Sequence, residues 1–286
     1  MKYGGVASQP SYLSNNVDLL RRMHAQTVRV SMFLNNAETK RYDFTALDQL
    51  RDVGLTEMII QSAETADAAK VGREIPQFIG YVDANPNLLF IYELGNEPDF
   101  YGEDPLVARS KRLTALRDVR PNYRRPNLLW AVNEIKSDGD PAYFDAYNRD
   151  AHDGLGAMFY SAAANQTYAP YAPDTITVHS YGTNTLCPSS GEPTNPWRVL
   201  DYVRGWSTSI NVKITEAGIN DSSAPDRGNR YVEFVAKLDQ ITGGQVDSVC
   251  FYALPQVNGN PVEAAYNIRA FEADQVGSRQ RSFYCS

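Results

Sequence analysis

Cysteine and histidine are scarce in this chain, and neither is spaced as in a metal site. The 286 residues include three cysteines, Cys187, Cys250 and Cys285, and three histidines. Because there is no CxxC pair and no two histidines stand at ligand spacing, neither a zinc site nor a dense disulfide framework is predicted. Cys250 lies in an apolar run typical of a buried thiol, whereas Cys187 and Cys285 lie in polar segments and could be paired or free.

Basic clusters and long hydrophobic runs are also missing. The 27 lysines and arginines stand against 34 aspartates and glutamates, a net charge of −7. We therefore expect no nucleic-acid partner, and no apolar stretch is long enough to span a bilayer. Met1 directly precedes a strand-like segment without a signal peptide, so a cytoplasmic protein and a secreted mature form both stay open. The sequence does not indicate an oligomeric state.

What the chain does contain is an ordinary globular composition, 43% hydrophobic and 21% charged, with a regular alternation of patterns. Short apolar runs are followed by longer amphipathic segments, and this unit occurs eight times. The segments 11–26 and 230–241 have helical periodicity, and a last helix is expected near 261–276. The predicted strands are 3–7, 27–32, 57–61, 88–94, 128–133, 174–179, 211–215 and 247–253.

Eight alternating strands and helices predict an α/β fold, a single (β/α)8 TIM barrel that forms one domain over residues 1–286. Such a barrel normally takes about 250 residues, so the length fits. The alternative is an open, doubly wound sheet, in which a glycine-rich turn normally follows the first strand. Here Gly4 and Gly5 are followed by Val6-Ala7-Ser8-Gln9-Pro10, which lacks the dinucleotide-binding pattern.

Two glutamates follow strand-like runs far apart in the sequence. Glu97 lies just beyond the fourth predicted strand and Glu216 at the end of the seventh, and a parallel barrel brings such strand ends to one face. Cleavage of a glycosidic bond needs a proton for the leaving oxygen and a carboxylate facing the anomeric carbon. This chemistry requires no metal and no other cofactor, so the pair predicts a cofactor-independent glycosidase acting on an oligosaccharide, polysaccharide or glycoconjugate.

The pattern resembles clan A glycoside hydrolases, which are retaining enzymes on (β/α)8 barrels. In that clan the acid/base follows strand 4, usually after an asparagine, and the nucleophile ends strand 7. The segment ELGNEPD at 93–99 is most similar to the heparanase and β-glucuronidase branch. The resemblance implies that Glu97 is the general acid and then base, Glu216 the nucleophile and Asn96 a ligand of the sugar 2-hydroxyl. A retaining pair stands about 5–5.5 Å apart and an inverting pair roughly 6.5–9.5 Å, and we expect the shorter separation.

Arg29, on the second predicted strand, matches the arginine that holds the nucleophile of the clan ionised and oriented. Its charge would lower the pKa of Glu216. Alternatively, Arg29 pairs with Glu93, which shares its strand face with Glu97, and the two pairings could coexist.

His179 and Tyr181 lie at the end of the sixth predicted strand. In related enzymes a tyrosine here donates a hydrogen bond to the nucleophile, and a nearby histidine contacts the sugar or a catalytic carboxylate. The alternative for His179 is a purely structural role. Many clan members also carry a tryptophan near the end of strand 8 as a sugar platform. This chain has Phe251 and Tyr252 there, and either ring could substitute.

Other strand ends supply further candidates. Asn133 and Glu134, after the fifth predicted strand, either bind substrate or form a polar cap on the loop. Gln61 and Glu64, near the end of the third, are weaker candidates for substrate contact.

Three other functions are compatible with these residues. A transglycosylase would use the same glycosyl-enzyme intermediate but pass the sugar to another sugar, a non-catalytic barrel would bind carbohydrate without hydrolysing it, and a scaffold would do neither. The motifs do not reveal the sugar, its linkage, or endo or exo action. The heparanase-like enzymes usually carry an additional β-domain for which this chain is too short, which weakens an inference of uronic-acid specificity.

Overall fold

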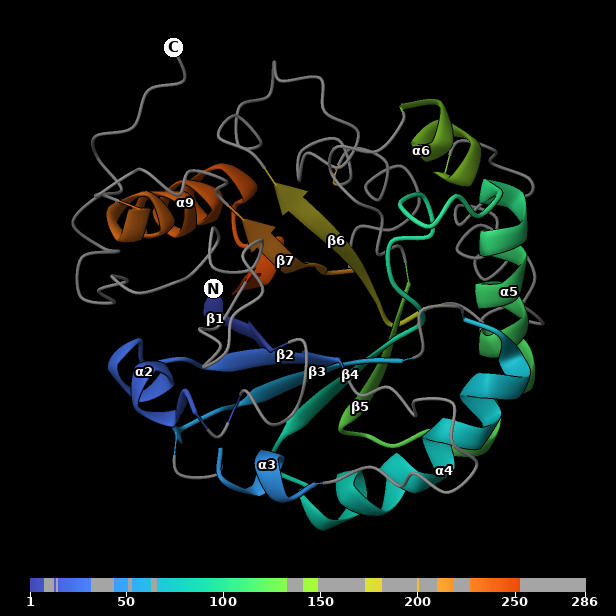
Figure 1. Ribbon diagram of the computed structural model, residues 1–286, viewed down its shortest axis with the longest axis horizontal. Coiled ribbons are helices and arrows are strands. Elements are labelled where there is room, and N and C mark those ends of the chain that lie inside the picture. Colours follow the sequence, from blue (N-terminus) through green and yellow to red (C-terminus); the bar gives the residue numbers. More distant parts are fainter. Residues whose placement is uncertain are drawn as a thin grey trace.

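The chain forms a closed barrel of eight parallel strands, with each strand paired to the next and β8 paired to β1 (Figure 1). The computed structural model describes residues 1–7, 13, 15–31, 44–50, 53–62, 66–132, 141–148, 173–181, 200, 210–218 and 227–252. The strands are β1 (Lys2–Ala7), β2 (Thr27–Ser31), β3 (Glu57–Gln61), β4 (Leu89–Glu93), β5 (Leu128–Val132), β6 (Thr175–Tyr181), β7 (Val212–Gly218) and β8 (Val246–Phe251). All eight predicted strands and the (β/α)8 barrel are confirmed.

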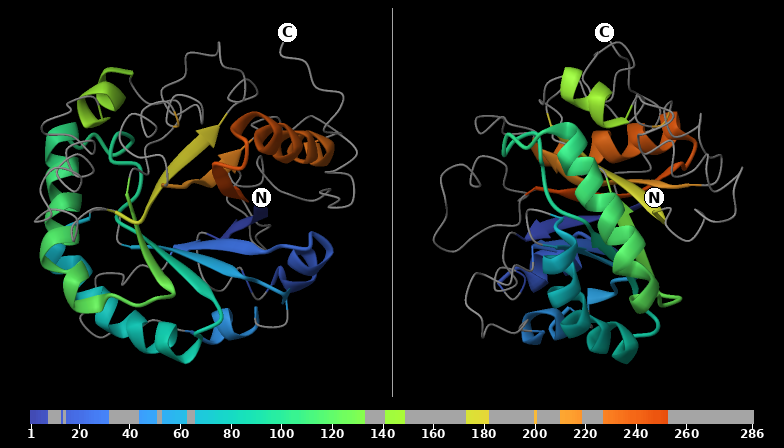
Figure 2. Two further views of the ribbon diagram at one scale, coloured as in Figure 1. Left: turned by 180° about the vertical axis from the view of Figure 1, so that it is seen from behind. Right: turned by 90° about the vertical axis from the view of Figure 1, so that its right-hand side faces the viewer.

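The described helices lie around the outside of the barrel, as the three views show (Figures 1 and 2). None of them combines the length and the apolar character needed to cross a bilayer. The predicted helix at 230–241 is present as the centre of α9, whereas Cys187, Cys285 and the predicted helix at 261–276 lie outside the described residues. The helices are α2 (Val17–Arg22), α3 (Thr45–Asp48), α4 (Ala68–Ala84), α5 (Pro105–Asp118), α6 (Pro141–Asn148) and α9 (Arg227–Thr242), with a 3-10 turn η2 (Arg120–Tyr123).

Strand alternation divides the hydrophobic core into two parts. In β4, Ile91 belongs to a small cluster inside the barrel, while Phe90 and Tyr92 belong to the larger cluster between the strands and the helices. Successive side chains of a strand point to opposite faces, so Glu93 shares the inner face with Ile91. The inner cluster also contains Val6, Ile59, Ala131 and Cys250.

Helix α4 shows how the outer layer is fixed. Asp67 caps it by accepting hydrogen bonds from the backbone N–H groups of Ala69 (2.8 Å) and Lys70 (3.1 Å). Its inner face is buried, and Phe78 packs edge to face on Phe90 with ring centroids 5.3 Å apart. Burial of this apolar face against the strands stabilises the helix.

The seventh strand is longer than the predicted 211–215. It extends to Gly218, so Glu216 lies within β7 and not just past its end. The register against β6 shifts between Val178 and His179, and that against β8 shifts between Ile214 and Ala217. Such irregularities re-aim side chains, and no pattern of apolar residues announces them.

A charge network fills the interior at the amino ends of the strands. Lys2 and Lys213 both donate to Glu57 Oε2 at 2.9 Å, and Lys213 also donates to Asp247 Oδ1 at 2.7 Å. Burial raises the pKa of Glu57, but the charges of Lys213 and Lys2 outweigh it, so the pKa lies below its ordinary value. Burial lowers the pKa of Lys213, but Glu57 and Asp247 reverse this and raise it. Each charge is therefore stable only while its partners are present.

We predict that Lys213→Met lowers the free energy of unfolding by about 3 kcal/mol, because it removes one partner from a buried ion pair. Urea denaturation measures this loss. Adding Glu57→Gln to the variant should recover part of it. As a control, Asp83→Asn breaks the exposed pair in which Arg125 Nε donates to Asp83 Oδ1 at 2.6 Å, and it should cost far less. Equal losses for Lys213→Met and Asp83→Asn would contradict the assignment.

Candidate active site

Glu97 is held in an ordered turn that follows β4. Its φ is +34°, a left-handed conformation that is uncommon for a residue other than glycine. Gly95, at φ +97°, precedes it and donates its N–H to Ser62 Oγ at 2.9 Å. The backbone carbonyl of Glu97 accepts the N–H groups of Phe100 (3.0 Å) and Tyr101 (3.2 Å). These bonds fix an unfavourable backbone conformation, and such conformations cluster at functional sites.

Glu216 lies on β7, across the register shift from His179 on β6. Both residues are buried, and Glu97 is 9% exposed. The barrel thus brings two carboxylates that are far apart in the sequence to the carboxyl end of its sheet, the end at which TIM-barrel active sites lie.

Arg29, fully buried on β2, connects Glu216 to a further carboxylate, that of Glu93. Its Nε donates to Glu93 Oε2 at 2.6 Å, its Nη1 donates to Glu216 Oε1, and its Nη2 donates to Asn96 Oδ1 at 2.9 Å. The two pairings that the sequence left as alternatives are both present. The planar guanidinium therefore fixes Glu216, Glu93 and the residue before Glu97 relative to one another.

Two residues of β6 complete the cluster. The hydroxyl of Tyr181 donates to Glu216 Oε2. His179 Nδ1 lies 2.8 Å from Glu97 Oε1 and 3.6 Å from Glu216 Oε2, so the imidazole contacts both carboxylates. A carboxylate oxygen of Glu97, one of Glu216 and a ring nitrogen of His179 all lie within 4.8 Å of one another.

The charges at the site keep Glu216 ionised. Burial raises the pKa of Glu216, but the charges of His179 and Arg29 and the hydrogen bonds from Tyr181 and Arg29 bring it below its ordinary value. Burial lowers the pKa of His179, but Glu216 and the hydrogen bond to Glu97 raise it above the usual value. Burial and the adjacent carboxylates raise the pKa of Tyr181 far above the usual value, so its hydroxyl stays a donor.

Glu97, His179 and Glu216 are also close enough together to bind a metal ion. However, both oxygens of Glu216 already accept hydrogen bonds, one from Arg29 and one from Tyr181. A metal ion would have to displace these donors and would lie beside a buried guanidinium. The arrangement is better suited to an anionic carboxylate that stays free of metal.

Of the other predicted site residues, two lie in the described part of the chain and three do not. Tyr252 is half-buried and packs edge to face on Tyr181, with ring centroids 6.2 Å apart. Gln61 is buried and accepts a hydrogen bond from Ser31 Oγ at 2.6 Å, so its visible role is structural. Asn133, Glu134 and Glu64 lie outside the described residues. Ser62, whose hydroxyl accepts the N–H of Gly95, was not predicted as a site residue. The sequence indicates such a role only through its position one residue beyond β3.

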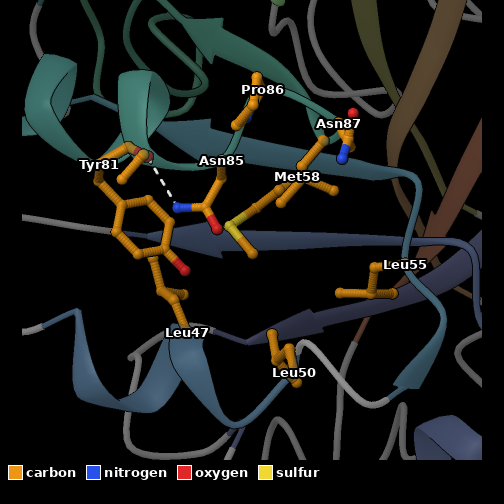
Figure 3. A pocket seen from close by; sticks show the side chains of 10 residues that line it. Leu47, Leu50, Leu55, Met58, Tyr81, Asn85, Pro86 and Asn87 are labelled. Atoms are coloured by element: carbon orange, nitrogen blue, oxygen red, sulfur yellow. Dashed lines mark hydrogen bonds between the residues drawn. The ribbon is translucent and has the colours of Figure 1, made fainter.

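A cavity of about 360 Å³ lies away from these carboxylates, between α3, α4 and the starts of β3 and β4 (Figure 3). Leu47, Leu50, Leu55, Met58 and Tyr81 form its apolar wall, and Asn85 donates to the Tyr81 carbonyl at 2.8 Å. It opens near the amino ends of the strands, where conserved features of TIM barrels serve stability, so it does not contribute to the cluster around Glu97 and Glu216.

Comparison with solved structures identifies several similar barrels. A glucosidase from Croceicoccus marinus superposes with a TM-score of 0.62 at 15% identity over 98% of this chain, which spans 66% of that protein. The endo-1,4-β-D-mannanase of Thermotoga petrophila RKU-1 gives 0.58 at 15% identity, covering 99% of both chains. A GH128 exo-β-1,3-glucanase from Aureobasidium namibiae gives 0.53 at 13% identity, covering 98% of this chain and 96% of the other. At such identities the similarity shows the fold.

No protein-family model matches the sequence, and no curated protein does either.

We predict that Arg29→Met destabilises the protein by about 3 kcal/mol near neutral pH, and by less near pH 4. In the wild type the lowered pKa of Glu216 contributes stability above its unfolded pKa, which is lost as the pH falls through the folded value. In Arg29→Met, burial should instead raise the pKa of Glu216. The variant is then most stable at low pH, where Glu216 is protonated, and it loses stability as the pH rises.

Urea denaturation of both proteins at the two pH values measures this difference. Arg29→Lys serves as the matched control, since it keeps the charge but loses the planar fork. Its free energy of unfolding should lie between those of the wild type and Arg29→Met. A loss that is independent of pH would show that Arg29 acts through packing alone.

Proposed function

We propose that this chain is a retaining glycoside hydrolase that cleaves β-linked sugars by double displacement, with Glu97 as acid/base and Glu216 as nucleophile. The observation that carries the proposal is the close approach of the two carboxylates: an oxygen of each lies within 4.8 Å of the other and of a His179 nitrogen. Nearest oxygens this close leave little room for a water between the two carboxyl groups, which supports the separation of about 5–5.5 Å used in retention over the roughly 6.5–9.5 Å used in inversion.

The first step requires Glu216 as an anion facing the anomeric carbon. Arg29 and Tyr181 support this role, because each donates a hydrogen bond to a different oxygen of Glu216 and lowers its pKa. As the glycosidic bond breaks, positive charge develops on the sugar ring and Glu216 forms the bond to the anomeric carbon.

Glu97 supplies the proton to the departing oxygen. His179 Nδ1 contacts Glu97 Oε1, which leaves Oε2 to carry that proton toward the substrate. Once the leaving group has gone, Glu97 is an anion that removes a proton from water, and the water then hydrolyses the glycosyl-enzyme. Asn96, oriented by Arg29, is the ligand for the 2-hydroxyl.

The substrate class proposed here is a β-linked neutral sugar of the glucan or mannan type. The structural neighbours include a glucosidase, a mannanase and a β-1,3-glucanase. A uronic acid, as in the heparanase and β-glucuronidase branch, needs a cation for its carboxylate. Arg29 already donates to Glu93, Glu216 and Asn96, so its guanidinium is poorly placed to serve a uronate.

Activity on aryl β-glucosides, mannosides, galactosides, xylosides and glucuronides tests the assignment. We expect Glu97→Gln and Glu216→Gln to lower kcat/KM by at least about 10²-fold on the substrate that wild type cleaves, with the β-anomer as its first product by NMR. Glu103→Gln, on the same loop as Glu97, is the matched control and should retain turnover. An initial α-anomer would reject double displacement, and sugar binding without turnover would favour the non-catalytic barrel.

We predict that Tyr181→Phe moves the acid limb of the kcat/KM profile to higher pH. The lost hydrogen bond is one of the interactions that lower the pKa of Glu216, so its removal raises that pKa and protonates the nucleophile sooner. A pH–rate profile measures the shift. Tyr252→Phe removes a hydroxyl from the neighbouring ring and should leave the limb in place. An unmoved limb in Tyr181→Phe would exclude Tyr181 from this role.

A further inference from the structure

Large hydrophobic side chains with high exposure are concentrated in one segment of the described chain. They are Phe100 (61% exposed), Tyr101 (52%), Leu106 (52%) and Val107 (47%). All of them lie within ten residues after Glu97, on the loop between β4 and α5 and on the first turn of α5 (Figure 1). Exposed apolar side chains gathered in one segment mark an interaction site more often than isolated ones do.

The two aromatic residues belong to a turn that is closed by backbone hydrogen bonds. Their backbone N–H groups both donate to the carbonyl of Glu97, and Glu103 N–H donates to the Pro98 carbonyl at 2.9 Å. The rings of Phe100 and Tyr101 pack edge to face with centroids 5.3 Å apart. Farther along, Asp104 caps α5 by accepting the N–H groups of Leu106 and Val107. The backbone that carries the aromatic pair is therefore tied to the backbone of the proposed catalytic acid, and the two rings pack on each other.

The position of the pair relative to Glu97 indicates which part of a substrate it meets. A general acid stands on the side of the leaving group, because it must reach the oxygen that departs. Phe100 and Tyr101 are three and four residues beyond Glu97, in the loop that follows β4, and the loops at the carboxyl ends of the strands are the ones that build the substrate sites of TIM barrels. Of the described exposed rings, these are the ones that follow the proposed acid in the chain. Aromatic rings bind the apolar face of a sugar, and the Tyr101 hydroxyl adds a polar contact.

On this basis we propose that Phe100 and Tyr101 form a platform for the sugar on the leaving-group side of the cleaved bond. The proposal rests on the proposed function and deepens it, since it assigns the substrate to oligosaccharides and polysaccharides. Conjugates with a small non-sugar leaving group would not use the platform. Leu106 and Val107 carry similar exposed apolar area on the helix, without a ring to stack on a sugar.

Two kinds of substrate test this assignment. The ratio of kcat/KM on a β-linked oligosaccharide of five or six units to that on the methyl β-glycoside of the same sugar should fall roughly tenfold or more in F100A/Y101A, the effect of losing stacking on the leaving-group sugar. L106A/V107A is the matched control, and its ratio should stay at the wild-type value. An unchanged ratio in F100A/Y101A, or an equal fall in both variants, would overturn the platform while leaving the proposed hydrolase intact.

Affinity electrophoresis in gels containing β-mannan, β-1,4-glucan or β-1,3-glucan separates failure of the platform from failure of the proposed function. If wild type hydrolyses nothing but is retarded by a polysaccharide, and F100A/Y101A is not, the aromatic pair binds sugar, and both the hydrolase and the leaving-group assignment are rejected. If wild type neither hydrolyses nor is retarded, or if F100A/Y101A is retarded equally, the platform is rejected. Self-association that is lost equally in both double variants would instead identify a surface for a second copy of the chain.

Discussion

The buried guanidinium of Arg29 is the interaction on which the carboxyl end of the barrel depends. It lies on β2, yet it binds Glu93 on β4, Asn96 in the loop that follows and Glu216 on β7. Buried carboxylates need a positive partner, and one arginine serves both Glu93 and Glu216. It also orients the residue that precedes Glu97. Arg29 thus acts with His179 and Tyr181 to keep the proposed nucleophile ionised, and it fixes the residue beside the proposed acid.

The two ends of the barrel use buried charge differently. At the amino ends of the strands, each buried charge has a partner of opposite sign. The ion pairs join Glu57 to Lys2 and Lys213, and Lys213 to Asp247. At the carboxyl ends, the described carboxylates Glu93, Glu97 and Glu216 share the cation of Arg29 and the ring of His179. There the backbone at Glu97 is left-handed and the register of β7 is irregular. Strain and unbalanced charge of this kind reduce stability, and folded proteins keep them where function requires them.

Much of the fold could be read from the sequence, because the eight apolar runs and the amphipathic segments between them have distinct periods. The position of Glu97 and Glu216 at one end of a barrel followed from strand order alone. The sequence predicts less about the site where its geometry depends on a single residue or contact. The extension of β7 past residue 215, its irregular register and the partners of Glu57 all arise from contacts between residues distant in sequence, and local patterns carry no record of these.

Double displacement requires that Glu216 form a covalent bond with the sugar. Incubation with 2,4-dinitrophenyl 2-deoxy-2-fluoro-β-glycosides, in which the fluorine slows the second step, followed by peptide mass spectrometry, tests it most directly. We predict one fluoroglycosyl group per chain, attached to Glu216, with loss of activity at the same rate. A label on Glu97 or on another residue, or no label while the enzyme releases an inverted product, would contradict the account.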